Sequence, residues 1–390
     1  MFAGASIWEK LEKERKAARS HIIFFAILFA VLFGWMCFYF TQTAIEDRVE
    51  LFDNDYNHRD ELLATRNRRG GIYASDSETL LASTRTDVDE EGNVVQIRSY
   101  PFGSMYAHVV GYAQLGGSGL EEHFKYELLH SDLPLSEKVR YDNQEEPEDK
   151  LYPGNNLITT LDPDIQEACY EAMGNYEGAV IVTEVKTGRI LAMVSKPDYD
   201  PNYIEEDWEN LLEDNESGTL LNRVTQGLYP PGSTFKIVDC IDLLQEDPAA
   251  MENYSFTCTG VFEQGGESIH CYEYEVHGEV GLEESFAHSC NASFANIGVN
   301  MISADTMSAT LKSLLFNSKL PYDLPYIRSA VNMPNTLSTE GIMQMAIGQG
   351  TTSMTPLHLN MITSAVANGP GRSAAQQPNQ RRRLPEQRTN

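Results

Sequence analysis

The chain has 390 residues, enough for two or three domains, and its 42% hydrophobic content is typical of a protein with a folded core. It carries 57 acidic and 29 basic residues, which give a formal net charge of −28. This charge disfavours nucleic acid and anionic lipid surfaces as partners, and it suits a protein that stays soluble beside a polyanionic matrix or in salt. A solvated acidic surface without a specific partner explains the charge equally well.

Residues 22–40 form an uncharged apolar run near the N-terminus. Such a run is long enough to cross roughly 30 Å of hydrocarbon, so we predict a transmembrane helix over residues 21–42. The segment before it contains five basic residues: Lys10, Lys13, Arg15, Lys16 and Arg19. The positive-inside rule therefore assigns residues 1–20 to the cytoplasm and the chain after about Thr41 to the outside of the cell membrane. A cleaved signal peptide is the alternative, but its apolar core would be shorter, about 7–15 residues.

Residues 43–150 are rich in charge and turn formers, with short strand-like runs such as Val94–Ile97 and a glycine-rich stretch at 116–119. We interpret them as a small, extended, extracytoplasmic module. The polar, acidic stretch 142–150 suits a surface connection, so we place a domain boundary near residue 150.

A second domain is predicted over residues 151–368. Helical spacing predicts a helix at 162–173. Two apolar β-rich runs, 178–185 and 189–195, predict a hairpin that is closed by the turn Lys186-Thr187-Gly188.

Two polar segments are predicted to lack regular secondary structure. Residues 203–218 hold seven acidic side chains around Trp208 and are interpreted as a solvated loop, with a gate to a site as a weaker alternative. Residues 369–390 hold five arginines, no lysine and no aromatic residue, and are predicted to be a disordered, aberrant tail that is unrelated to the fold.

The six cysteines are too scattered for a disulfide scaffold or a repeated metal-ligand spacing. Only Cys258 and Cys271 look paired, because they flank a glycine-rich loop outside the membrane, where a disulfide can persist. The nearby His270 and His277 leave a metal site as a weaker alternative. We favour two structural cysteines, free or bridged, and assign no metal and no cofactor.

The most informative stretch is Tyr229–Lys236, with the sequence Tyr-Pro-Pro-Gly-Ser-Thr-Phe-Lys ahead of an apolar run. Its Pro-Pro-Gly prevents a helix from extending backward, so a helix is predicted over 233–245. Ser233 and Lys236 then share one helix face, where the lysine amine can activate a hydroxyl that is too weakly acidic to attack a carbonyl unaided. The spacing predicts a nucleophile and its base; a helix start with a solvent-facing lysine is the alternative.

A second motif is Ser289-Cys290-Asn291, at the entry to an apolar helical stretch. Its hydroxyl and its amide can face the first site across a groove, and we interpret Cys290 as a buried spectator. A Ser-x-Asn triplet alone is uninformative, but the order, flanks and separation of the two motifs make the pair specific.

Together these motifs resemble those of the class B penicillin-binding proteins, single-pass transpeptidases that cross-link bacterial peptidoglycan. The resemblance covers most of the chain in family order. Its further matches are Arg68–Tyr73, His108–Tyr112, Gly117–Glu121, Leu161–Gln166, Asp200–Asn202, Cys271, His277–Gly278, Gly348–Gly350 and Thr355–His358. It implies an α/β (α+β) fold, in which a membrane-anchored, extended module precedes a serine β-lactamase-like transpeptidase domain.

The resemblance implies that Ser233 attacks the penultimate D-Ala of a stem peptide and forms an acyl-enzyme, and that β-lactams acylate the same serine. Lys236 would be the base, Ser289 would relay a proton, and Asn291 would hold Lys236 and the substrate amide. The expected partners are peptidoglycan stem peptides, β-lactams and the membrane, with no nucleic acid.

The family's third motif, Lys-Thr-Gly, is missing from its place after Gly348–Gly350. The one Lys-Thr-Gly of the chain, residues 186–188, precedes the nucleophile in a hairpin turn, so it is assigned no catalytic role. We therefore expect a transpeptidase domain that lacks its final strands and helix through a frameshift or false gene end, and a chain that folds poorly or is inactive. Losing oxyanion-hole donors alone costs about 10²–10³ in turnover.

A non-enzymatic function is the alternative. In it the chain is a membrane-anchored scaffold whose N-terminal module and helix contact a polytopic glycan polymerase, as class B family members are thought to do. The two functions differ in a complementation test. In cells that lack this protein, a Ser233→Ala chain would restore the function of a scaffold but not that of an enzyme.

Overall fold

The computed structural model describes residues 19, 21, 23–40, 42, 59–89, 93–145, 150–214 and 216–369. The predicted cytoplasmic segment and the predicted tail therefore lie outside the described residues, apart from Arg19 and Gly369. Chain contacts divide the protein into two units, residues 1–66 and 67–390, and each is described by itself.

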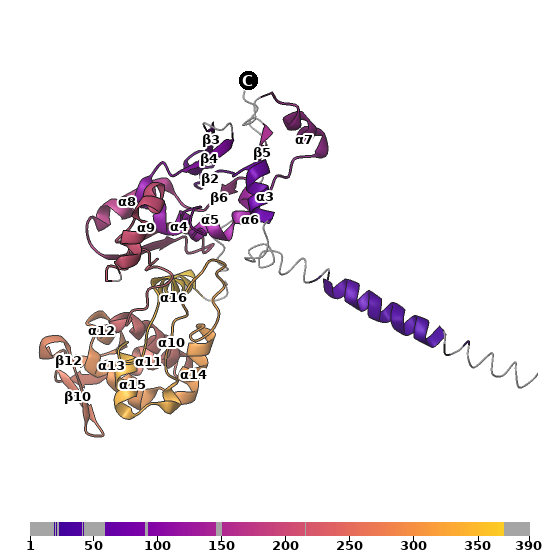
Figure 1. Cartoon of the computed structure of the whole chain (residues 1–390). Coiled ribbons are helices and arrows are strands. Elements are labelled where there is room, and N and C mark those ends of the chain that lie inside the picture. The colour runs from indigo at the N-terminus through magenta and orange to yellow at the C-terminus, as the bar shows by residue number, and fades with distance from the viewer. Residues whose placement is uncertain are drawn as a thin grey trace, which may run out of the picture. The chain divides into compact units, whose positions relative to one another are not determined.

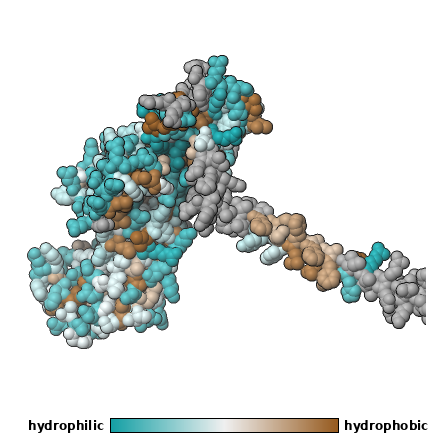
Figure 2. All heavy atoms as spheres, viewed as in Figure 1, coloured by the Kyte–Doolittle hydropathy of each residue, from teal (hydrophilic) through white to brown (hydrophobic). Residues whose placement is uncertain are grey.

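The first unit contains an apolar helix, Ile23–Phe40, and a short helix, α3 (Arg59–Arg66). Among the described residues, Ile23–Phe40 is the one helix long and apolar enough to cross a membrane. Its large apolar side chains are exposed, and they form the brown rod in Figure 2. The helix stands where the sequence predicts one and is a candidate membrane anchor.

The second unit begins with short strands and helices (Figure 1). In chain order these are β1 (Asn67–Arg68), β2 (Ile72–Tyr73), β3 (Leu80–Val88), β4 (Val94–Ser99), the 3-10 turn η1 (Gly103–Tyr106), α4 (Ala107–Val110), α5 (Gly119–His123), α6 (Lys125–Leu129), α7 (Leu135–Asp142), β5 (Tyr152–Pro153) and β6 (Leu157–Ile158).

The strands of this part form a four-stranded sheet in the order β4-β3-β2-β6, and a separate pair of β1 with β5. The strand predicted around Val94–Ile97 is confirmed as β4, which pairs antiparallel with β3. In the parallel pairings, β1 meets β5 and β2 meets β6. Each of these two strand pairs joins a strand before position 150 to a strand after it. The domain boundary at that position remains a prediction.

A buried group of charged residues, here called the arginine–glutamate cluster, joins two of the family-like motifs. Glu121 is fully buried and accepts hydrogen bonds from Arg69 Nε at 2.6 Å and from Arg98 Nε at 2.7 Å. Arg98 also donates to the Gly70 carbonyl at 2.7 Å. The cluster therefore fixes the Arg-Gly-Gly segment against α5, with charges that are paired rather than exposed.

The remaining elements follow β6. They are α8 (Pro163–Met173), β7 (Gly178–Thr183), β8 (Ile190–Lys196), η3 (Pro201–Tyr203), α9 (Ile204–Glu213), η4 (Gly232–Phe235), α10 (Lys236–Glu246), α11 (Ala250–Asn253), β9 (Phe256–Cys258), β10 (Val261–Gln264), β11 (Glu267–His270), η5 (Tyr272–Tyr274), β12 (Gly278–Val280), α12 (Leu282–Ala287), α13 (Asn291–Asn296), the π-helix η6 (Ile297–Met301), α14 (Ala304–Ser313), η7 (Pro334–Thr336), α15 (Thr339–Ala346) and α16 (Pro356–Asn368).

The predicted helix at 162–173 and the predicted hairpin are confirmed. The Asp162 side chain caps α8 by accepting from two backbone N–H groups, which satisfies donors that a helix start leaves free. Strands β7 and β8 pair antiparallel, with Val180 opposite Val194, and the turn between them contains Gly188 at φ 74°. A positive φ is costly for residues with a Cβ, so glycine suits this turn.

The interpretation of residues 203–218 as a solvated loop is wrong over most of its length, because α9 occupies residues 204–213. The buried Ile204 belongs to the main core, and Trp208 and Leu211 pack against that core. These three side chains follow helical spacing, so they share one face while the acidic residues point to solvent. The acidic composition concealed an amphipathic helix.

A second hydrophobic core lies beneath the two motifs that the sequence singles out. It gathers Phe235 and Val238 with Phe294 and Ile297, so it holds α10 beside α13. In Figure 1 these helices lie together with α14 and α15. Because Ser233 and Ser289 stand at the entries to α10 and α13, this core sets the distance between them.

Candidate active site

Ser233 lies on the 3-10 turn η4, directly before α10 begins at Lys236. The predicted helix start is therefore confirmed, except that its first turn is a 3-10 turn rather than an α-helical one. Phe235 is fully buried, with its ring centroid 5.9 Å from that of Phe316. This burial anchors the turn, while Ser233 itself remains exposed to solvent. An accessible hydroxyl on a rigid turn suits a nucleophile.

Lys236 is 1% exposed, and its amine is surrounded by oxygen atoms. Its Nζ lies 3.2 Å from Ser233 Oγ, 2.9 Å from Ser289 Oγ and 2.8 Å from Asn291 Oδ1. It also donates to the Ser289 carbonyl oxygen at 2.7 Å. The alternative of a solvent-facing lysine is wrong, and the structure brings the four predicted site residues together.

Burial is also what changes the proton affinity of this amine. Loss of hydration lowers the pKa of Lys236 to about 8, and it outweighs the opposing attraction that an ionised Cys290 or Asp239 would exert. Nζ also lies 5.3 Å from the centre of the Phe294 ring. A lysine with this pKa is partly neutral near physiological pH, as a general base must be.

Ser289 lies in the loop between α12 and α13, and Asn291 is the first residue of α13. Ser289 Oγ donates to Ser233 Oγ at 2.7 Å, so the two hydroxyls and the lysine amine form a closed triangle. Ser289 has φ 53°, a left-handed conformation that is uncommon for a residue with a side chain. Asn291 is held from behind, because its Nδ2 donates to the His270 carbonyl at 3.1 Å.

Asp239, one turn beyond Lys236 on α10, is a further buried acid that the sequence reading did not single out. Its side chain is fully buried, and neither carboxyl oxygen has a hydrogen-bond partner among the described residues. Burial raises the pKa of Asp239 well above its usual range. A protonated Asp239 places no full negative charge beside the lysine.

The Gly348–Gly350 segment lies against the nucleophile turn. Gly232 donates its N–H to the Gly348 carbonyl at 2.9 Å, and Tyr229 and Met354 exchange backbone hydrogen bonds of 2.9 and 2.8 Å. A Cβ at Gly348 would collide with the Gly232 carbonyl oxygen. This close approach explains why the Gly-Gln-Gly motif accompanies the serine motif.

The Lys-Thr-Gly triplet at residues 186–188 lies in the turn between β7 and β8, as the sequence predicts, with Lys186 and Thr187 exposed. Thr187 donates to the Glu184 side chain, and Arg189 Nε lies 3.1 Å from the same carboxylate. These contacts stay local to the hairpin. The triplet has a structural function in the turn and takes no part in the network around Ser233.

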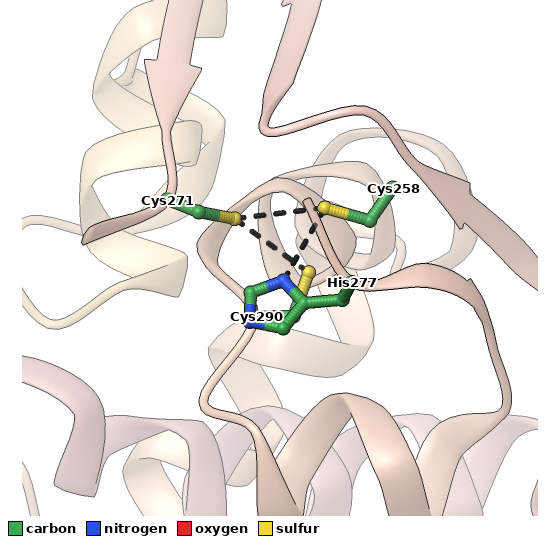
Figure 3. Close-up of side chains that lie close together, drawn as sticks. All are labelled: Cys258, Cys271, His277 and Cys290. Atoms are coloured by element: carbon green, nitrogen blue, oxygen red, sulfur yellow. Dashed lines mark hydrogen bonds between the residues drawn. The ribbon is translucent and has the colours of Figure 1, made fainter. Parts of the chain in front are cut away.

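A second cluster of reactive side chains lies directly behind Ser289 and Asn291. It consists of Cys258, Cys271, His277 and Cys290, here called the Cys/His cluster, whose side chains point toward one another from β9, the end of β11, the loop before β12 and the start of α13 (Figure 3). Their ligand atoms all lie within 4.8 Å of one another. All three cysteines are free and buried, so Cys258 and Cys271 are not bridged.

The sequence predicts only part of this cluster. Its candidate metal site contains Cys258, Cys271 and His277 together with His270, and it leaves out Cys290. In the structure His270 contributes its carbonyl to Asn291 instead. No spacing in the sequence links Cys290, the middle residue of the Ser-x-Asn motif, to the other two cysteines, and only the structure shows that all three are buried together.

The family model of the penicillin binding protein transpeptidase domain matches residues 178–375, more than half of the chain. Among curated proteins, the peptidoglycan D,D-transpeptidase PbpA of Mycobacterium tuberculosis is 30% identical over 330 residues, which are 79% of this chain and 64% of that protein. The chain thus spans less than two thirds of the length of this relative.

Solved structures give the same result. Penicillin-binding protein A from M. tuberculosis, as a ceftriaxone acyl-enzyme complex, matches with a TM-score of 0.68 and 30% identity over 78% of this chain and 70% of the other. The D,D-transpeptidase domain of a peptidoglycan glycosyltransferase from Eggerthella lenta matches with a TM-score of 0.66 and 29% identity over 78% of this chain and 70% of the other. The chain belongs to the penicillin-binding protein transpeptidase family.

Proposed function

We propose that the chain is a peptidoglycan D,D-transpeptidase that forms an acyl-enzyme at Ser233 with D-Ala-D-Ala stem peptides, and that β-lactams acylate the same residue. One observation carries the proposal: the closed triangle of Ser233 Oγ, Lys236 Nζ and Ser289 Oγ, with separations of 3.2, 2.9 and 2.7 Å. The relatives named as D,D-transpeptidases and as β-lactam acyl-enzymes support it.

In the first half-reaction, Ser233 Oγ attacks the carbonyl carbon of the penultimate D-Ala and transfers its proton to neutral Lys236. The bond from that carbonyl to the nitrogen of the terminal D-Ala breaks, and Ser289 relays a proton to the leaving amine. An amine from a neighbouring stem peptide then attacks the ester carbonyl, the bond to Ser233 Oγ breaks, and the proton that the amine loses returns through the same side chains to Ser233 Oγ. Among the three side chains each transfer spans one hydrogen bond, the distance that general acid–base catalysis requires.

Asn291 has a positioning function in this scheme. Its Oδ1 accepts from Lys236 at 2.8 Å, which leaves the amine between the two hydroxyls. The second N–H of Nδ2 would donate to the substrate peptide group, since the amide is only partly buried. A side-chain amide suits this position because it offers both a donor and an acceptor without adding charge.

The test is acylation of the purified 390-residue chain by a fluorescent penicillin, followed by mass analysis of the peptide that contains residues 229–236. We expect labelling at Ser233 and none in a Ser233→Ala chain. Thr234→Ala is the matched control, because Thr234 is the exposed hydroxyl residue next to the nucleophile and its Oγ1 donates to the Pro231 carbonyl instead.

Labelling that persists in Ser233→Ala would overturn the assignment of the nucleophile. An unlabelled wild-type chain that is folded by circular dichroism would overturn the proposed acylation.

The membrane arrangement is part of the proposal. The helix Ile23–Phe40 would cross the membrane once, with residues 1–20 in the cytoplasm and the catalytic part outside. Its exposed apolar surface would also be available to a polytopic glycan polymerase. Reporter fusions on either side of the helix test the orientation. A reporter that is active outside the cell when fused before the helix would contradict it. Site-specific crosslinking from the helix tests the partner.

A further inference from the structure

We propose that Cys258, Cys271, His277 and Cys290 bind one Zn²⁺ ion in a tetrahedral Cys₃His site, and that this ion holds the Ser289-Cys290-Asn291 motif in its active geometry. The coupling to catalysis rests on the proposed function, whereas metal binding stands on its own observations.

The spacing of the ligand atoms is that of a tetrahedral zinc site. With zinc–sulfur bonds of about 2.3 Å, two thiolates at the corners of a tetrahedron lie about 3.8 Å apart, and a thiolate and an imidazole nitrogen about 3.5 Å. The Sγ atom of Cys271 lies 3.7 Å from that of Cys258 and 3.7 Å from that of Cys290. Nδ1 of His277 lies 3.4 Å from Cys258 Sγ.

A disulfide does not account for this arrangement. A disulfide requires two sulfur atoms about 2.05 Å apart, and here Cys271 is equally distant from two possible partners. Any single bridge among three cysteines leaves one thiol unused. A metal ion engages all three, and it also uses the imidazole.

The surroundings of the cluster also favour a bound cation. Cys258 and Cys290 are fully buried, Cys271 is 4% exposed, and the side chain of His277 is 5% exposed. Backbone N–H groups of Gly260 and Ser293 donate to the sulfur atoms of Cys258 and Cys290, at 3.3 and 3.4 Å. Such donors stabilise thiolates, the form of cysteine that binds metals.

The imidazole has an orienting partner on its other nitrogen. His277 Nε2 lies 3.7 Å from Glu275 Oε2, which leaves Nδ1 directed toward the sulfur atoms. A carboxylate behind a histidine ligand is a common arrangement at zinc sites. Three thiolates and one imidazole form a closed, soft donor set of the structural type, which leaves no open position for a substrate.

The link to the active site is covalent. Cys290 stands between Ser289 and Asn291, whose side chains lie 2.9 and 2.8 Å from Lys236 Nζ. On the other side, Asn291 is anchored by the carbonyl of His270, the neighbour of Cys271. An ion that joins Cys271 to Cys290 therefore fixes both the motif and its support, including the left-handed Ser289 at φ 53°.

The first experiment measures metal. We expect the full chain, purified in detergent under reducing conditions, to hold about one zinc ion by elemental mass spectrometry and to show thiolate–cobalt absorption bands after exchange with Co²⁺. Cys271→Ser should lower zinc affinity by at least about 100-fold. Cys169→Ser is the matched control, because Cys169 is a free, half-buried cysteine on α8 outside the cluster.

A wild-type chain that binds no more zinc than Cys271→Ser would overturn the site. Because a ligand variant can fail to fold, the wild-type chain is also stripped with a chelator and reloaded with Zn²⁺. If the stripped chain takes up Zn²⁺ again and regains any circular dichroism signal that it lost on stripping, the site is supported. A stripped chain that keeps its fold and does not take up Zn²⁺ or Co²⁺ again contradicts it.

The second experiment measures coupling, as the acylation rate with a fluorescent penicillin in stripped and reloaded chains. We expect removal of the ion to slow acylation about 10²-fold, the effect of displacing a catalytic group by about 1 Å, and reloading to restore it. Equal rates in both states would overturn the coupling and leave the proposed function intact. Metal binding without acylation in either state would overturn the proposed function and, with it, the coupling, but not the site.

Discussion

The arginine–glutamate cluster near the start of the second unit and the lysine site beside Ser233 both bury basic side chains, but they surround them with different partners. Arg69 and Arg98 share the carboxylate of Glu121 at 2.6 and 2.7 Å. Lys236 is surrounded by two hydroxyls, an amide oxygen and a carbonyl. An ionised partner keeps a buried cation charged, whereas neutral oxygens leave the proton removable.

This difference in partners suits the arginine–glutamate cluster to stabilising the fold and the lysine site to proton transfer. A guanidinium stays protonated at any physiological pH, so the arginines serve to join segments of the chain. An amine with a pKa of about 8 changes its charge within the working range of an enzyme. The predictions below test whether this contrast is correct, from the largest expected effect to the smallest.

Replacing the base should have the largest effect. Lys236→Met keeps the apolar stem and removes the amine, so we expect acylation of Ser233 by a fluorescent penicillin to slow by about 10²–10⁴-fold, the usual contribution of a general base. Lys312→Met, at an exposed lysine on α14, is the control and should react as the wild type does. An unchanged rate in Lys236→Met would show that another group takes the proton.

Removing the carboxylate of the arginine–glutamate cluster should lower stability instead. Glu121→Gln leaves two buried guanidinium groups without a counter-charge, and we expect the free energy of unfolding to fall by about 3–5 kcal/mol in urea titrations. Glu206→Gln, at an exposed position on α9, should change it little. A loss below about 1 kcal/mol would mean that the cluster contributes no more than a surface ion pair.

The pH dependence of acylation should follow Lys236. Its pKa is lowered to about 8, so the neutral, reactive amine is the minor form below this pH and the major form above it. We expect the rate to fall about tenfold for each pH unit below the midpoint and to level off above it. Stopped-flow measurements at pH values below and above 8 test this expectation. A rate that does not rise with pH would refute Lys236 as the base.

The smallest effect is expected at Asp239. If its raised pKa keeps this carboxyl neutral, Asp239→Asn exchanges one neutral group for another, and the midpoint of the pH profile should stay near 8. An ionised Asp239 would support the charged lysine, and its removal would then shift the midpoint downward. Such a shift would show that the lysine site has a carboxylate partner after all.

Local patterns in the sequence predicted much of this site. The Pro-Pro-Gly ahead of Ser233 and the spacing to Lys236 determine the turn and the start of α10, and the turn at residues 186–188 determines the hairpin. Both depend on neighbours in the chain, which periodicity and turn formers report directly.

Features that depend on distant residues were not predictable in the same way. The side chains of the Cys/His cluster come from four separate places in the chain, and no short motif in the sequence predicts it. The helix α9 was concealed for a different reason, because its acidic residues outweighed the apolar spacing of Ile204, Trp208 and Leu211. Asp239 was invisible as a buried acid because composition does not report burial.

The contact between Gly232 and Gly348 limits how the sequence can vary beside Ser233. Both glycines have positive φ values, 57° and 67°, and any side chain at Gly348 would meet the Gly232 carbonyl. A substitution that adds bulk beside Ser233 is therefore not accommodated at Gly348. Gly232 has more space around it, with Gln349 Nε2 3.8 Å from the position of an added Cβ, but its positive φ also disfavours a side chain, so both glycines resist substitution.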